Sequence, residues 1–432
     1  MRICFVADIR SPIARQWIQY LVVTGLEVLV IASYPCDPNA IPGAQVMVEP
    51  LAFTGLFGKR WYPSGRRTDR PSAGASLSSS TSPMALRSLE RQLIKRSTGA
   101  ASTLHLLCGP VELLWHRPRV RTAIERFHPD VVHALRFPFE GMMAALATPT
   151  TIPLIISVWG NDFTLQAPRN PIIGHRTRQA TGRADGLMAD CRRDVRLARE
   201  WGFSENRPAA VLPGAGGVRT DVFYPGPVRT DVGSRYAIPD DARVVINPRG
   251  VRGYVRNDAF FAAIPSVAAR HPTALFVCVG MAGNPQIEAQ VRKLGIADQV
   301  RLLPTVPHDE MADLFRRGDI AISPSEHDGT PNTLLEAMAC GCFPVAGDIE
   351  SIREWIVAGE NGLLFDPTDP TAIAGALTDA LERPVLRATA STANLLLIAD
   401  RARHDAVMQR AVAFYHQVVS SFIAPAAITS SV

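Results

Sequence analysis

The sequence predicts an α/β protein made of two doubly wound domains, each a parallel sheet with helices on both faces. Three observations support this expectation. Short runs rich in β-branched residues alternate with longer amphipathic stretches along nearly the whole chain, which is the order that produces parallel sheets covered by helices. The alternation falls into two sets, separated by a stretch rich in Gly, Pro and charged residues at 213–233. The length of 432 residues suits two domains of ordinary size.

Each expected strand is a short apolar run bounded by polar or turn residues. In the first set the expected strands are Arg2–Ala7, Glu27–Ala32, Val131–His133, Leu154–Val158, Gly186–Ala189 and Ala210–Leu212. In the second set they are Arg243–Asn247, Ala274–Val279, Val300–Leu303, Ile320–Ser323 and Phe343–Ala346. Helices are expected between them, for example at Ile13–Val23, Pro285–Leu294 and His308–Arg316.

These elements predict a first domain at 1–212, a second domain at 213–402 and a C-terminal helix at 403–432 that packs back on the first domain. In open parallel sheets the binding site lies beyond the carboxyl ends of the strands. Two facing sheets would therefore place a site in a cleft between the domains.

The composition argues against several classes of protein. With 47% hydrophobic and 20% charged residues and no apolar run of membrane-spanning length, we expect neither a disordered, a fibrous nor a transmembrane protein. A net charge of +5 is too small to indicate a nucleic-acid partner. The seven cysteines are scattered and lack the spacing of a zinc site, and the first residues form a strand instead of a secretion signal. We expect a cytoplasmic protein with reduced cysteines.

The positive charge is concentrated in one region. Residues 51–100 carry 9 Lys and Arg against 2 Asp and Glu. A mobile basic loop is expected at about 63–100, because 63–82 is rich in Ser, Gly, Pro and Arg. The segment 84–96 predicts a basic amphipathic helix, which either packs on its own domain or makes peripheral contact with the inner face of an anionic membrane. Its leucines and cations are Leu86, Leu89, Leu93, Arg87, Arg91 and Lys95.

The segment 324–341, PSEHDGTPNTLLEAMACG, has the most informative pattern in the chain. A strand ends before a polar turn, and a helix is expected to start near Pro331. Free backbone N–H groups at a helix start favour an anion such as a phosphate. Asp328 in the turn and Glu336 in the helix add carboxylates, which accept hydrogen bonds from sugar hydroxyls. The segment therefore indicates a ligand with both phosphates and hydroxyls, such as a nucleotide sugar.

This segment resembles the signature of the retaining glycosyltransferases of family 4, the glycosyl transferases group 1, which have the GT-B fold of two Rossmann-like domains. In that family an E-x7-E element lies within PS-x-x-E-G-x-P-x-x-x-L-E-A-M-A-x-G, followed by a Pro-Val strand and by G-x-x-G-x-L-x-x-P-x-D. The matching residues here are Pro324, Ser325, Gly329, Pro331, Leu335, Glu336, Ala337, Met338, Gly341, Pro344, Val345, Gly359, Gly362, Leu364, Pro367 and Asp369.

The resemblance implies a donor site in the second domain. Glu336 would bind the ribose hydroxyls, and Asp328, one methylene shorter than the family's usual Glu, would contact the donor sugar or help hold the transition state. Backbone groups would hold the sugar and its diphosphate along Gly329, Thr330, Pro331, Asn332, Thr333 and Leu334.

Arginines follow the expected strand Arg243–Asn247, and guanidinium groups can bind phosphate oxygens in pairs. Arg249 matches the family's Arg at this place, which implies a role in catalysis and in donor binding. Tyr254 stands where the family has Lys. We assign the second cation to Arg256, which directly precedes a predicted helix as the family's Lys does, in preference to Arg252.

Two segments of the first domain resemble the family's acceptor-side loops, DVVHALR at 130–136 and SVWGNDF at 157–163. By that resemblance His133 has a catalytic role, and Asn161 and Asp162 bind the acceptor. From the residues alone, His133 is equally a hydrogen-bonded histidine at a strand end. The first strand-to-helix turn lacks the glycine pair frequent in this fold, so Arg10 is expected to contact the acceptor there.

These assignments predict a retaining, metal-independent glycosyltransferase. It would use a UDP- or GDP-sugar without a cofactor, and the acceptor would be a glycan, a lipid-linked glycan or a small metabolite. Two alternatives remain, a nucleotide-sugar epimerase of the same fold and a non-catalytic binding protein of that fold. A nicotinamide-dependent oxidoreductase is disfavoured, because no G-x-G-x-x-G follows the first strand of either half.

Overall fold

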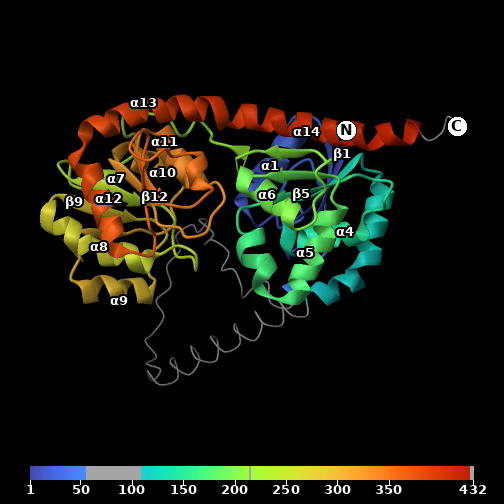
Figure 1. Ribbon diagram of the computed structural model, residues 1–432, viewed down its shortest axis with the longest axis horizontal. Coiled ribbons are helices and arrows are strands. Elements are labelled where there is room, and N and C mark those ends of the chain that lie inside the picture. Colours follow the sequence, from blue (N-terminus) through green and yellow to red (C-terminus); the bar gives the residue numbers. More distant parts are fainter. Residues whose placement is uncertain (55–108, 214–215, 429–432) are drawn as a thin grey trace, which may run out of the picture.

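The structure is a computed structural model that describes residues 1–54, 109–213 and 216–428. Figure 1 shows two lobes side by side, with a long helical segment running along both. The basic loop at about 63–100 and the basic helix at 84–96 that the sequence predicts lie outside the described residues. Among the residues described, no helix combines the length and the apolarity that crossing a bilayer requires.

Within the described residues, the first lobe contains a seven-stranded sheet in the order β3-β2-β1-β4-β5-β6-β7, and all its pairings are parallel. The strands are β1 (Arg2–Ala7), β2 (Glu27–Ala32), β3 (Gln45–Val48), β4 (Val131–Ala134), β5 (Leu154–Val158), β6 (Gly186–Ala189) and β7 (Ala209–Val211). The six expected strands are confirmed to within one residue at their ends. The sequence does not predict β3, a four-residue edge strand whose first residue is exposed and whose other three are only partly buried.

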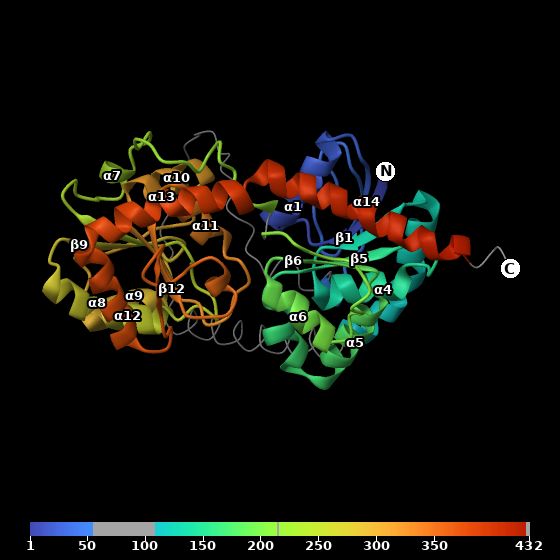
Figure 2. The same cartoon turned by 45° about the horizontal axis from the view of Figure 1, so that its top comes forward.

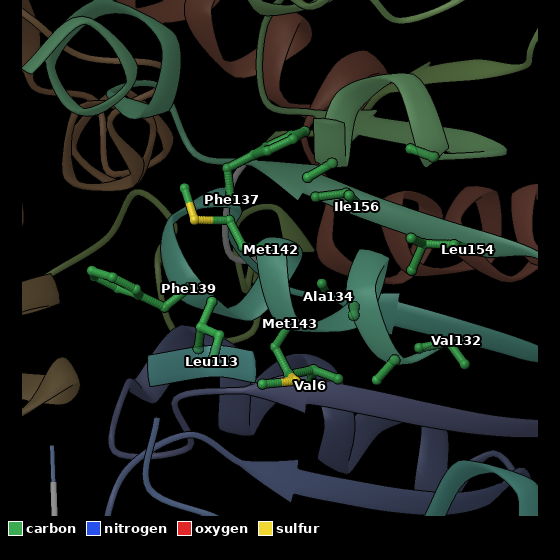
Figure 3. Close-up of a cluster of buried hydrophobic side chains, with 14 of the residues drawn as sticks. Val6, Leu113, Val132, Ala134, Phe137, Phe139, Met142, Met143, Leu154 and Ile156 are labelled. Atoms are coloured by element: carbon green, nitrogen blue, oxygen red, sulfur yellow. The ribbon is translucent and has the colours of Figure 1, made fainter. Parts of the chain in front are cut away.

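The helices of this lobe are α1 (Pro12–Val23), one over 109–127, α4 (Met142–Ala147), α5 (Pro171–Arg183) and α6 (Arg192–Glu200), with short turns of helix η1 (Phe137–Gly141), η2 (Asp162–Gln166) and η3 (Ala167–Arg169). Successive side chains of a strand point to opposite faces of the sheet. Cys4 and Val6 of β1 therefore enter one core, with α4, α5 and the helix over 109–127. Figure 3 shows part of this core, including Val6, Leu113 and Met143. Ile3 and Phe5 enter the other core, with α1.

The second lobe contains a six-stranded parallel sheet in the order β10-β9-β8-β11-β12-β13. Its strands are β8 (Arg243–Asn247), β9 (Ala274–Cys278), β10 (Val300–Leu302), β11 (Ile320–Ser323), β12 (Phe343–Gly347) and β13 (Leu363–Phe365). Its helices are α7 (Val232–Arg235), α8 (Asn257–Arg270), α9 (Pro285–Leu294), α10 (His308–Arg317), α11 (Asn332–Ala339), η5 (Ile352–Glu354) and α12 (Pro370–Glu382). The five expected strands are present, and β13 is a short addition at the sheet edge. The two-domain α/β architecture predicted from the sequence is therefore confirmed.

Two helices at the end of the chain connect the lobes. The first, α13 (Pro384–Arg401), packs on the second lobe through Ala390 and Ile398. The second, α14 (His404–Ile428), crosses to the first lobe (Figure 2). There Phe414 and Tyr415 join the core that contains Ile3. Helix α14 therefore covers the face of the first sheet on which α1 also packs.

Tyr415 makes the central polar contact of this packing. The indole N–H of Trp17 donates to the Tyr415 hydroxyl at 3.0 Å, and that hydroxyl lies 2.7 Å from Nδ1 of His133. Tyr415→Phe is expected to lower the free energy of unfolding by about 1–3 kcal/mol, because the buried indole N–H loses its acceptor. Urea denaturation followed by tryptophan fluorescence measures the change. Tyr20→Phe, at a partly buried tyrosine of α1, is the matched control, and an equal loss in both variants would contradict the assignment.

Candidate active site where the two sheets meet

The carboxyl ends of strands from both sheets meet at one place. We call residues 157–163 the β5 loop and residues 324–334 the β11 loop. Their backbones touch, since a Cβ atom on Gly160 would lie 2.1 Å from the amide nitrogen of Gly329. A Cβ atom on Gly329 would lie 2.2 Å from a carboxylate oxygen of Asp190, which follows β6. Glycine is required at position 160, where the contact is with backbone and φ is +77°. At position 329 a Cβ atom would displace the carboxylate of Asp190.

Arg249 lies at the carboxyl end of β8, with its backbone N–H donating to the Asn247 side chain at 3.1 Å. Its guanidinium is 6% exposed, forms an ion pair with the Asp328 carboxylate and donates to the Thr333 hydroxyl at 3.3 Å. Its Nε–H has no acceptor among the described residues. The structure therefore brings together Arg249 and Asp328, two residues that the sequence predicts for the donor site.

Glu336 lies on α11 and is a partly buried residue. Burial raises the pKa of Glu336 to about 7, although the nearby positive charge of Arg249 opposes the shift. The start of α11 has no side chain capping its N–H groups. A cation, two carboxylates and uncapped amides therefore gather at this helix start.

The predicted run of amide donors at 329–334 needs correction. The amide of Gly329 donates to its neighbour Asp328 at 3.1 Å, that of Thr330 to Asp190 at 3.2 Å, and that of Leu334 to the Pro331 carbonyl at 2.9 Å. Pro331 has no N–H. Within the described part of the chain, only the amides of Asn332 and Thr333 in this run lack an acceptor. These two are the amides available to an anion in this conformation.

Arg256 lies at the edge of the site. Its guanidinium pairs with Asp258 at 2.9 Å and with Glu326 of the β11 loop at 3.4 Å. The backbone N–H of Arg256 donates to the Pro324 carbonyl at 2.7 Å. The residue is therefore beside the β11 loop, and its charge is already balanced by two carboxylates in this conformation.

His133 is a core residue with no exposed surface, which contradicts the catalytic role predicted for it. Along β4 it shares a face with Val131, so its ring points into the core covered by α14. The ring is fully buried, with Nδ1 bonded to the Tyr415 hydroxyl at 2.7 Å and Nε2 to the Ser157 hydroxyl at 2.8 Å. Burial lowers the pKa of His133 to about 3, so the ring is neutral. His133 is therefore a hydrogen-bonded histidine at a strand end, which is the alternative interpretation that its sequence position allowed.

The predicted acceptor residues lie at the carboxyl edge of the first sheet. Asp162 is 2% exposed, because its carboxylate turns inward to accept the Trp159 N–H at 2.8 Å. Burial raises the pKa of Asp162 to about 6. Asn161 has a buried, unpartnered Oδ1, and Arg10 pairs with Asp8 at 2.9 Å. Asp162 therefore shapes the β5 loop, and no contact of these residues with an acceptor follows from the geometry.

Two further residues of the site, Asp190 and Arg193, follow β6. The sequence did not predict a role for either of them. Asp190 accepts the Thr330 amide at 3.2 Å, and its backbone carbonyl accepts the Thr330 hydroxyl at 2.5 Å. Arg193 donates to carbonyls in the β5 loop and in the β11 loop. Their position in the sequence could have indicated such a role. Asp190 directly follows the expected strand Gly186–Ala189, and other residues of the site also lie just after the carboxyl end of a strand.

Asp190, Cys191 and Asp194 place their side-chain ligand atoms within 4.8 Å of one another. The guanidinium of Arg193 is next to these side chains and forms an ion pair with Asp194 at 2.7 Å. Burial, the largest cause, and the negative charges of both aspartates raise the pKa of the Cys191 thiol, so the thiolate that a metal ion needs is disfavoured. The donor set does not suit a metal ion.

Two family models match the chain. The model described as Glycosyl transferases group 1 matches residues 230–394, and the model described as Glycosyl transferase 4-like domain matches residues 11–214. Together they cover most of both lobes.

Curated relatives and solved structures agree with these matches. The chain is 31% identical over 212 residues to a D-inositol 3-phosphate glycosyltransferase of Thermobispora bispora, which covers 46% of this chain and 49% of the relative. It is 31% identical over 277 residues to the protein of that name from Geodermatophilus obscurus, covering 59% and 60%. The chain thus spans about half the length of these relatives.

Among solved structures, sucrose-phosphate synthase from Thermosynechococcus elongatus matches with a TM-score of 0.70 at 15% identity, over 98% of this chain and 100% of that one. HepE of Anabaena in complex with UDP matches with a TM-score of 0.69 at 14% identity, over 96% and 100%. At these identities the likeness concerns the fold, and the predicted GT-B fold is confirmed.

Proposed function

The chain belongs to the glycosyl transferases group 1, and we propose that it transfers a sugar from a nucleoside diphosphate donor to an acceptor hydroxyl. The observation that carries this proposal is the contact of Arg249 with Asp328 beside the start of α11. A buried guanidinium with one unsatisfied N–H, two uncapped amides and two carboxylates offer partners for both halves of a nucleotide sugar. In the donor complex Arg249 would exchange the Asp328 carboxylate for phosphate oxygens.

We propose that the reaction retains the configuration at the anomeric carbon. The acceptor oxygen forms its bond to this carbon as the bond to the β-phosphate oxygen breaks on the same face, and the hydroxyl proton passes to that phosphate oxygen. Arg249 and the amides of Asn332 and Thr333 stabilise the negative charge that develops on the diphosphate. Arg249 thus supplies the positive charge for which other transferases use a metal ion.

The choice of substrates to test first comes from the similar proteins. HepE of Anabaena, which shares the fold, has been solved with UDP and with UDP-glucose. We propose a UDP-sugar as donor, with a GDP-sugar as the second candidate. The names of the curated relatives make D-inositol 3-phosphate the first acceptor to test.

The experiment that tests the donor site is calorimetry of the purified protein with UDP, GDP and ADP, repeated with Arg249→Ala and Glu336→Ala. We expect one nucleotide to bind with a Kd of about 1–100 μM in the wild type and at least tenfold more weakly in each variant. Binding of none below about 1 mM, or equal binding by both variants, would contradict the site. Interconversion of the donor sugar without an acceptor would instead support an epimerase.

The affinity for UDP-glucose is expected to depend on pH through Glu336. The pKa of Glu336 is raised to about 7, so the carboxylate that accepts the ribose hydroxyls is ionised above this pH and protonated below it. We expect the affinity to fall about three- to tenfold from pH 8 to pH 6, measured by calorimetry. UDP-glucose is the suitable probe because its phosphates do not titrate in this range.

The matched control for this pH dependence is Glu336→Gln, which keeps the shape of the side chain and removes its titration. The variant should bind UDP-glucose weakly and equally at both pH values. A fall of the same size in Glu336→Gln would assign the pH dependence to another group.

A further inference from the structure

We propose that Arg193 is a positioning residue that holds the β5 loop of the first lobe and the β11 loop of the second in register for sugar transfer. This inference rests on the function proposed above. Arg193 lies in the first turn of α6 and is 7% exposed. Helix α6 lies on the side of the first lobe that faces the second (Figures 1 and 2).

The guanidinium of Arg193 binds the backbone of one loop from each lobe. Nη2 donates to the carbonyl oxygen of Gly160 at 2.7 Å, and Nη1 donates to the carbonyl oxygen of Asp328 at 2.7 Å. Nε and Nη2 also donate to a carboxylate oxygen of Asp194, at 2.9 and 2.7 Å, which fixes the plane of the guanidinium. Only a planar fork of donors makes these contacts at once, because an ammonium group is a single point.

The contact with Asp328 orients a peptide of the donor site. Its carbonyl oxygen accepts from Arg193 and, at 2.8 Å, from the Ser351 hydroxyl. In a planar trans peptide the C=O and the following N–H point in opposite directions. The N–H of Gly329 is therefore aimed away from Arg193, toward the side where the Asp328 carboxylate meets Arg249.

The contact with Gly160 gives the same anchor to the β5 loop. Gly160 touches Gly329 directly, so the two loops have no freedom to slide past each other while Arg193 holds both carbonyls. Transfer requires the acceptor oxygen and the anomeric carbon to be held close together, and a misplacement of about 1 Å can reduce the rate about 10²-fold. Arg193 is the described side chain that links both loops by hydrogen bonds.

One contact between the lobes at α6 is exposed to solvent and provides a matched control. Arg196, one turn further along α6, pairs with Glu350 of the second lobe at 2.8 Å, and both side chains are more than half exposed. Exposed ion pairs of this kind contribute little to stability. Arg196→Ala therefore removes an ion pair between the lobes without touching either loop.

The test compares wild type, Arg193→Lys and Arg196→Ala in three measurements. The first is the Kd for UDP by calorimetry, the second is kcat and KM for transfer from UDP-glucose, and the third is hydrogen exchange of peptides covering the β5 and β11 loops. In Arg193→Lys we expect kcat to fall about 10- to 100-fold while the Kd for UDP changes less than about threefold, because the nucleotide contacts lie in the second lobe. Both loops should exchange faster, and Arg196→Ala should match the wild type.

Three results would overturn the proposal. A wild-type kcat in Arg193→Lys would show that a positive charge at this position is enough for transfer. Equal losses of UDP binding and of kcat in this variant would show that Arg193 only maintains the fold. Unchanged exchange in both loops would show that Arg193 does not hold them. Absence of binding of UDP, GDP and ADP alike in the wild type would instead contradict the proposed function, and the exchange measurement would still decide whether Arg193 links the loops.

Discussion

Replacing Arg249 by methionine is expected to lower kcat for sugar transfer by about 10²–10³-fold, which corresponds to about 3–4 kcal/mol of lost transition-state stabilisation. Methionine keeps much of the apolar volume of the side chain and removes its charge. The leaving diphosphate would lose the buried cation placed beside it, and Asp328 would lose its ion-pair partner. Steady-state kinetics with UDP-glucose measure kcat, and circular dichroism checks that the variant is folded.

The control for this variant is Arg252→Met in the same loop. Arg252 is exposed and donates to the Tyr254 hydroxyl at 3.2 Å, away from Asp328. We expect its kcat to stay within about twofold of wild type, because a single exposed arginine contributes little. Equal losses in Arg249→Met and Arg252→Met would mean that only the net charge of the loop matters, and the assignment of Arg249 would fail.

Gly160→Ala is expected to abolish most of the transfer activity, with a loss of about 10²-fold or more. The added methyl group would lie 2.1 Å from the Gly329 amide nitrogen, which is backbone and cannot move without displacing the β11 loop. The two loops would have to separate, while Arg249 and Glu336 would stay in place within the second lobe. UDP binding should therefore remain near wild type while kcat falls, measured by calorimetry and by steady-state kinetics.

The variant Gly25→Ala is the control for this prediction. It shows the effect of backbone strain at a positive φ without the steric collision that Gly160→Ala adds. Gly25 has a φ of +87°, close to the +77° of Gly160, but no atom lies within 4 Å of the position a Cβ would take. Both variants incur the cost of a left-handed alanine, about 1 kcal/mol, and only Gly160→Ala adds the collision. Similar kinetics in the two variants would show that the loops do not need close contact for transfer.

Much of the proposed donor site could be predicted from the sequence because its signals are local. The order of strand, turn and helix start at 324–341 places Asp328 and Glu336 eight residues apart at one strand end. Arg249 follows another strand, and the carboxyl ends of parallel strands meet at one edge, so its meeting with Asp328 follows from the fold class. The hydrogen-bond acceptors of the individual amides do not follow, because Asp190 of the first lobe takes the Thr330 amide.

The roles of His133 and Arg193 in the first domain were harder to predict, because both depend on contacts with distant parts of the chain. The face of the sheet toward which His133 points depends on the register of β4 and on α14, which arrives from 282 residues further along the chain to bond it. Arg193 contacts a carbonyl 33 residues before it and another 135 residues after it. Neither contact has a periodic or motif signal, since each depends on how distant segments pack.

The sequence by itself determined the alternation of strands and helices, the two parallel sheets and the motif at the start of α11. Hydrophobic period and turn residues act over a few positions, so they can be recognised in one chain. Only the tertiary structure decided that His133 is a core residue and that Gly160 and Gly329 touch. The same holds for Arg193 between the two loops, because docking one lobe on the other selects contacts that no local pattern encodes.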